Sequence, residues 1–203
     1  MTTLHGPLLY VRSRALPLTL AALTATAAFA VWAATRLDAY VDPDRRVPVV
    51  ALAPLLASAV IGTSLYSASD ELDRTAVRPW WPRRLTQLAV LTALAALLVT
   101  PAVLGRAEVF GPPAVLRNTL GCTGVTAAAA VVLGARASWL PAFGYVTAVY
   151  LGFHGAHGRA ATVWAWPVQP GSQPGAWAAA LTAFALGAAG YAVRGARPEG
   201  PRG

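Results

Sequence analysis

The sequence predicts an all-α membrane protein with six transmembrane helices joined by short loops. Of its 203 residues, 56% are hydrophobic and 12% are charged, about half the charged share of a soluble domain. The apolar residues form six continuous runs, most of them near the ~20 residues that a helix needs to cross a bilayer. Barrel strands would instead alternate apolar and polar residues. The loops are too short for a soluble domain, so the chain is expected to be a single transmembrane domain.

The spans can be placed in chain order. The first contains Ala28-Phe29-Ala30, which resembles a signal-peptide cleavage site, but the run is longer than a signal peptide's and is expected to be a retained anchor. Pro54 is expected to kink the second. Gly121 and Gly124 suit the fourth to close helix packing, although a bias toward alanine and glycine would also explain them. The six expected spans are residues 15–34, 47–67, 85–104, 117–135, 139–154 and 175–193.

The arginines predict the orientation of the chain. All 16 basic residues are arginine, and their scatter over the loops favours membrane orientation over nucleic-acid binding. With the N-terminus inside, ten arginines lie in cytoplasmic segments and six, Arg117 among them, on the other side. We therefore expect a plasma-membrane protein with both termini cytoplasmic. The lack of lysine indicates GC-rich codon usage, as in actinobacteria.

The sequence does not predict an enzyme, a cofactor or a metal site. Without lysine it has no phosphate-binding loop. His154 and His157 are spaced as i, i+3, but no cysteine or acid lies nearby to complete a metal site. The hydroxyls of Ser58, Thr63 and Ser64 have no base in sequence reach and are expected to pack within the helix. The spans carry no carboxylate, which argues against a proton relay.

The loop at residues 68–84 carries the densest charge. Asp70 and Arg74 are spaced as i, i+4, so a short surface helix with acids at its positive end is expected, stopped by Pro79. Trp80 and Trp81 follow, as is typical at a lipid interface. The loop is either an ordinary solvated connection or a docking element for a cytoplasmic partner. Its charged residues before Pro79 are Asp70, Glu71, Asp73, Arg74 and Arg78.

Three segments give the chain the layout of a known family. Leu8–Val11 precedes the first span, Asp70–Arg78 lies between spans two and three, and Thr162–Pro167 precedes the last span. The patterns Glu71-Leu72-Asp73-Arg74-Thr75-Ala76 and Trp164-Ala165-Trp166-Pro167 are similar to those of actinobacterial membrane proteins identified as ABC permeases. In this layout the chain resembles permease subunits of ABC exporters of the type-two class.

This resemblance implies partners and roles. The chain would pair with a second permease subunit, identical or different, and with a separate ABC ATPase. The charged residues Asp70–Arg78 would form the ATPase-coupling segment, and Trp164, Trp166 and Pro167 a re-entrant or interfacial segment. The uniformly apolar spans suit a hydrophobic or amphipathic substrate. The alternative is a non-transporting polytopic membrane protein, such as an assembly, immunity or regulatory factor.

Overall fold

The computed structural model describes residues 16–38, 47–66, 80–104, 109–152 and 159–198. Within these ranges the chain is helical and contains no strand. Five helices are long and apolar enough to cross a membrane, which confirms an all-α, membrane-embedded protein. They are α2 (Leu16–Arg36), α3 (Val47–Ser64), α5 (Trp81–Val99, continued by the 3-10 turn η2, Thr100–Val103), α6 (Pro112–Leu133) and α9 (Pro174–Arg194).

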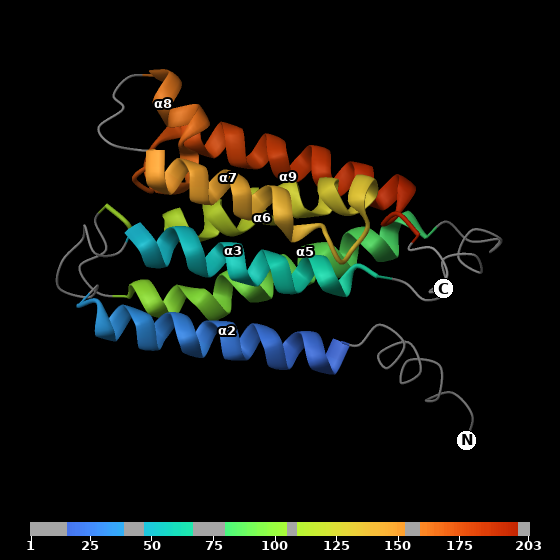
Figure 1. Cartoon of the computed structure of the whole chain (residues 1–203), viewed down its shortest axis with the longest axis horizontal. Helices are drawn as coiled ribbons and strands as arrows, with labels where there is room; N and C mark the ends of the chain where they lie inside the picture. Colours follow the sequence, from blue (N-terminus) through green and yellow to red (C-terminus); the bar gives the residue numbers. More distant parts are fainter. Residues whose placement is uncertain (1–15, 39–46, 67–79, 105–108, 153–158, 199–203) are drawn as a thin grey trace.

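Three shorter elements precede α9: α7 (Trp139–Gly152), α8 (Arg159–Trp164) and the 3-10 turn η3 (Trp166–Val168). The helices α2, α3, α5, α6, α7 and α9 lie side by side, and each runs opposite to the one before it (Figure 1). We call the end where α2 begins and α9 ends the terminal end. The opposite end, which carries α8, is called the α8 end.

The helix α6 is the centre of the bundle. It packs mainly against α9 and α3, and its span is the most buried of the five, whereas that of α2 is the least. The contact between α6 and α9 is close because glycines meet: a Cβ placed on Gly187 would overlap the carbonyl oxygen of Gly124. Small residues allow such an approach of two backbones in membrane helices.

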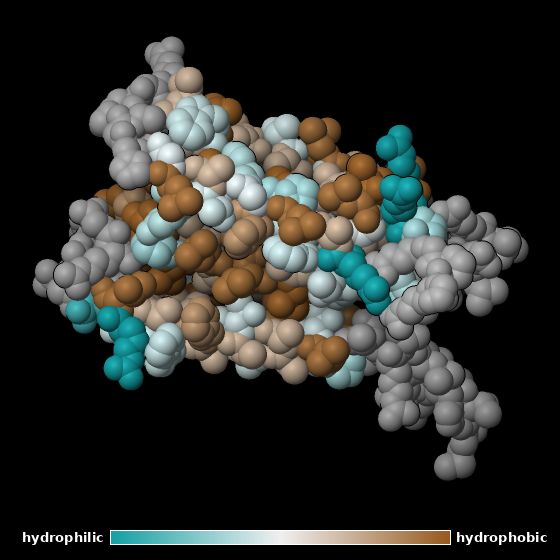
Figure 2. Space-filling view, viewed as in Figure 1, coloured by the Kyte–Doolittle hydropathy of each residue, from teal (hydrophilic) through white to brown (hydrophobic). Residues whose placement is uncertain are grey.

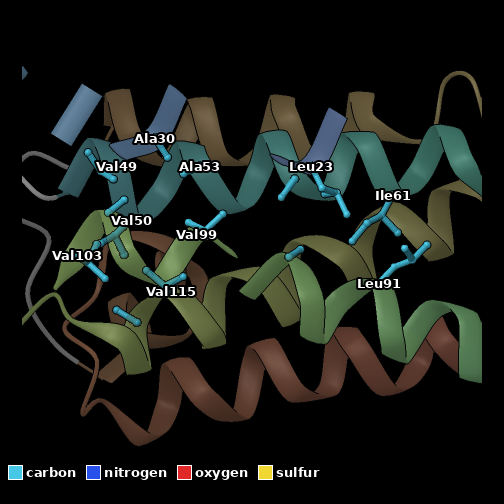
Figure 3. Packing of buried hydrophobic residues seen from close by; sticks show 14 of the residues in the cluster. Leu23, Ala30, Val49, Val50, Ala53, Ile61, Leu91, Val99, Val103 and Val115 are labelled. Atoms are coloured by element: carbon cyan, nitrogen blue, oxygen red, sulfur yellow. The ribbon is translucent and has the colours of Figure 1, made fainter. Parts of the chain in front are cut away.

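Two groups of buried apolar side chains fill the bundle. The larger joins α2, α3, α5, η2, α6 and α9, and its members turn toward a common interior in Figure 3. The smaller joins α3, α6, α7, η3 and α9 and includes Trp166. The hydroxyls of Ser58, Thr63 and Ser64 donate to carbonyls of their own helix, as expected for packing groups. On the face shown in Figure 2, hydrophilic residues lie toward the two ends of the bundle.

Two helices begin earlier than the sequence predicted. The helix α5 begins at Trp81 rather than at residue 85, and α6 begins at Pro112 rather than at residue 117. In both, proline occupies one of the first two helical positions, where its fixed φ favours the helix and its missing N–H costs little. Starting the fourth span at residue 117 was therefore wrong: Pro112 and Pro113 belong to α6, and Arg117 is a residue of that helix rather than a loop charge.

Candidate functional site: a buried arginine–asparagine pair beneath the segment before α9

Residues 165–171, between α8 and α9, are folded into the α8 end of the bundle. After α8, the side chains of Trp166, Pro167, Val168 and Gln169 are buried. This part of the chain is not α-helical. Its 3-10 turn pairs the carbonyls of Ala165 and Trp166 with backbone N–H groups, and the carbonyls of Pro167 and Gln169 need other donors. At membrane depth such backbone is tolerated only where protein groups or water satisfy it. Two adjacent residues of α6 supply that need.

Arg117 is the first of them. Its side chain is fully buried, and its guanidinium donates to the carbonyl oxygens of Pro170 (Nη1, 2.7 Å) and Gln169 (Nη2, 2.8 Å). Its Nε donates to Oδ1 of Asn118 at 3.0 Å. Arginine suits this role because its planar fork presents several donors at fixed angles. Three of its N–H groups thus bind uncharged oxygens.

Asn118 is the second. Its Nδ2 donates to the carbonyl oxygens of Pro167 (2.7 Å) and Val50 (2.8 Å). Val50 lies four residues before Pro54 in α3, and proline has no N–H to bind that carbonyl. The Asn118 amide therefore occupies an acceptor that Pro54 leaves open. It joins α3, α6 and the segment before α9 at one point.

Trp166 fixes the same segment by packing. Its indole lies against Gly121, where a Cβ would overlap the ring. Tyr145 of α7 lies 6.0 Å from Trp166 between ring centroids, and its hydroxyl donates to the carbonyl of Trp164. Gly121 thus provides space for a large side chain from another segment, which gives this glycine a role beyond composition bias.

Further hydrogen bonds join Gln169 and Gly171 to the neighbouring elements. Gln169 Nε2 donates to the Ala161 carbonyl in α8 at 3.4 Å. The backbone N–H of Gly171 donates to the carbonyl oxygen of Val109 at 2.8 Å, and the Trp177 indole N–H donates to the Gly171 carbonyl at 2.8 Å. We call residues 165–171 together with Arg117 and Asn118 the clasp.

The sequence-predicted site residues divide into two groups. Trp164 is exposed in α8, whereas Trp166 and Pro167 are buried in η3. That these three residues form a re-entrant or interfacial segment stays a prediction. The predicted coupling residues lie outside the described residues, as does Leu8–Val11. They are Asp70, Glu71, Asp73, Arg74 and Arg78.

Sequence reasoning missed Arg117 and Asn118. Arg117 was counted among the loop charges opposite to the termini, although it lies inside α6. The signal that could have found the pair is the spacing from Pro112, since a helix beginning there carries both residues more than a turn inside. An ionisable residue inside a membrane helix indicates a functional constraint by default.

Arginines at the terminal end pair with helix ends. Arg84 is nearly buried, and its Nη1 lies 3.5 Å from the carbonyl oxygen of Ala192, next to Gly195, which ends α9 with φ 73°. Arg197 donates from its backbone to Ala130 (2.9 Å) and from Nη1 to Val132 (3.1 Å), near the end of α6. Cations are favoured at these negative helix ends.

The chemistry available to the clasp is that of holding backbone in place. Its described hydrogen bonds use main-chain oxygens and one amide. Within the described residues no three His, Cys, Asp or Glu side chains gather as a metal site would require. Among the described residues the one carboxylate is that of Asp38, which follows α2 at the α8 end. Comparisons of the chain with protein-family models, characterised proteins and solved structures find no match.

Proposed function

We propose that this chain is the membrane-spanning permease subunit of an ATP-driven exporter of the type-two ABC class, with a hydrophobic or amphipathic substrate. The observation that carries the proposal is the clasp. Irregular backbone folded into a membrane bundle requires dedicated donors, and this chain keeps two buried polar side chains for it. A protein that needed only to be anchored would not require such a segment.

The packed interior bears on where a substrate would pass. Ile61, Leu88 and Val115 are fully buried in the larger apolar group, so side chains fill the space between the helices. The proposal therefore assigns the substrate path to the boundary between this chain and a second permease subunit. The outward faces of the helices are apolar and suit a hydrophobic or amphipathic molecule.

Coupling to ATP is assigned to the loop at residues 68–84. The helices α3 and α5 meet this loop at the terminal end, where α9 also ends. Its charged residues would thus face an ATPase on the side of the membrane where α9 ends. ATP hydrolysis itself is assigned to that separate chain, because this sequence has no lysine for a phosphate-binding loop.

The test reverses the loop charges at Glu71, Asp73, Arg74 and Arg78 together. One exposed ion pair contributes only about 0–1 kcal/mol, so a single change is too weak a probe. The net charge is unchanged, which leaves the positive-inside balance intact. We expect the variant to insert normally but to lose the ATPase that copurifies from the native host, together with its stimulated turnover.

The control scrambles the charges of Arg36, which ends α2, and of Asp38, Asp42 and Asp44, which follow it, and should leave ATPase binding at the wild-type level. The proposal fails if wild-type protein recovers no ATPase, or if the reversed loop binds and stimulates as well as wild type.

A non-transporting polytopic protein is the second candidate. The filled interior favours it, since a scaffold or regulatory protein needs no path for a substrate. The two candidates differ in the neighbouring gene as well as in the pull-down: an adjacent gene for an ATPase with a phosphate-binding loop favours transport.

A further inference from the structure

A groove with a volume of about 490 Å³ runs along the outside of the bundle between α6, α7 and α9. Its floor is shallow because α6 and α9 are in backbone contact at Gly124 and Gly187 and carry small side chains beside that point. All lining residues are apolar or glycine; those used below are Gly124, Ala128, Val132 and Leu133 of α6 and Leu186 and Gly187 of α9.

The groove has the length of one membrane leaflet. From Gly124 to Leu133 the helix rises about 14 Å at 1.5 Å per residue, close to half of the ~30 Å hydrocarbon core. Gly124 lies near the middle of α6, and Leu133 is its last residue. The groove therefore extends from near the bilayer centre to the surface at the terminal end, which is the reach of one lipid acyl chain.

Two exposed arginines stand at the surface end of the groove. Arg197 donates to the carbonyl of Val132, which lines the groove. Arg194 is the last residue of α9 and lies seven positions after Gly187, so both lie on one side of the helix. The one described carboxylate, Asp38, is at the opposite end of the bundle. An apolar groove thus meets positive charge at headgroup depth.

The nearby negative helix ends do not cancel this charge. The backbone N–H of Arg197 binds the Ala130 carbonyl at the end of α6, and the N–H of Gly195 binds the Tyr191 carbonyl at the end of α9. Arg84 lies at the Ala192 carbonyl. These donors occupy carbonyls that would otherwise repel a phosphate.

We propose that this groove binds an anionic phospholipid of the leaflet at the terminal end. One acyl chain lies in the groove from Leu133 toward Gly124, and the phosphate lies between Arg194 and Arg197. Basic sites between membrane helices are a known way of recognising acidic headgroups. The site does not depend on the transport proposal, since it uses only this chain and the bilayer.

The test uses the delipidated full-length protein in mixed micelles with equal amounts of dioleoylphosphatidylglycerol and dioleoylphosphatidylcholine, and native mass spectrometry counts the lipids retained. Wild-type protein should retain phosphatidylglycerol in preference to phosphatidylcholine. Arg194→Gln with Arg197→Gln should weaken the preference by about five-fold for each arginine, since one basic residue near an anionic surface contributes about 1 kcal/mol.

Two further variants test the acyl-chain part of the site and control for net charge. Ala128→Phe fills the groove from an exposed position and should reduce retention of both lipids. Arg36→Gln with Arg83→Gln removes the same net charge at exposed positions that do not line the groove, and should keep the preference of wild type.

Three results would overturn the site. Equal retention of both lipids by wild-type protein would mean that the arginines do not select an anionic headgroup. A preference that survives the Arg194 and Arg197 changes would place the headgroup elsewhere. If cross-linking shows a wild-type dimer that Ala128→Phe converts to a monomer while lipid preference stays, the groove is an interface between copies of this chain.

Discussion

At the scale of single residues, Asn118 and Pro54 are coupled although they lie on different helices. Pro54 removes the N–H that would bind the Val50 carbonyl, and the Asn118 amide takes that carbonyl at 2.8 Å. The same amide nitrogen binds Pro167. One side chain thus donates to the open carbonyl in α3 and to the segment before α9. Removing Pro54 should make the first of these hydrogen bonds unnecessary and leave the second in place.

Replacing Asn118 by leucine should lower the free energy of unfolding. The variant leaves the carbonyls of Val50 and Pro167 without a donor and Arg117 Nε without its acceptor. Each unsatisfied buried group costs about 1–3 kcal/mol. Pro54→Ala restores an N–H that can bind Val50 within the helix, so Asn118→Leu should cost about 1–3 kcal/mol less in that background.

The measurement is a double-mutant cycle by SDS titration of the four proteins in mixed micelles. The cycle is needed because Pro54→Ala also changes helix propensity. If Asn118→Leu costs the same with proline and with alanine at position 54, the Val50 carbonyl does not depend on the Asn118 amide.

Side-chain type predicted the environment of some residues but not of others. The hydroxyls of Ser58, Thr63 and Ser64 behaved as their type predicts, because a helix offers them its own carbonyls. Arg117 and Trp166 did not, because charge and indole character usually indicate water and the lipid interface. Their burial depends on partners more than 40 residues away along the chain, the carbonyls at 169 and 170 for Arg117 and the space above Gly121 for Trp166.

At the scale of elements, the apolar runs predicted the five long helices. The starts of α5 and α6 were placed too late because their first residues are charged or proline. A window of hydropathy assigns Arg83, Arg84 and Arg117 to water. In the structure Arg84 lies at the end of α9 and Arg117 in the clasp. The fold class was thus predictable from composition, and the clasp was not, because it arises from tertiary contacts between α3, α6 and the segment before α9.

The crossing of α6 and α9 gives a prediction at this scale. Gly187→Ala should lower the free energy of unfolding by about 1–3 kcal/mol, the usual cost of overpacking, because its Cβ would overlap the backbone of Gly124. Gly144→Ala is the matched control in α7, where a Cβ meets nothing within 4 Å. It should be neutral or stabilising by up to about 1 kcal/mol.

Both variants change one glycine to alanine inside a helix, so propensity contributes equally to each. The same SDS titration compares them with wild type. Equal effects of Gly187→Ala and Gly144→Ala would show that the two backbones are not in contact at this crossing.

At the scale of the whole molecule, α7 decides the topology. Its 14 residues span about 21 Å, less than the ~30 Å hydrocarbon core, whereas the other five helices are long enough. It nevertheless runs antiparallel to α6 and α9 (Figure 1). In this bundle α7 carries the chain from the terminal end to the α8 end, which gives six spans with the start of α2 and the end of α9 on one side. A chain in which α7 turned back would have five spans, with these two helix ends on opposite sides.

Cysteine labelling of the full-length chain distinguishes these topologies. Cys122 is the single cysteine and is buried, so Cys122→Ala provides a background for Ala137→Cys, Ser172→Cys and Gly203→Cys. These positions follow α6, α8 and α9 in turn. With six spans and cytoplasmic termini, a membrane-impermeant maleimide added to intact cells should label position 172 alone. Positions 137 and 203 should react only after permeabilisation, because the arginine bias keeps them inside. Equal labelling of 137 and 172 in intact cells would show that α7 does not cross, and labelling of 203 would reverse the orientation.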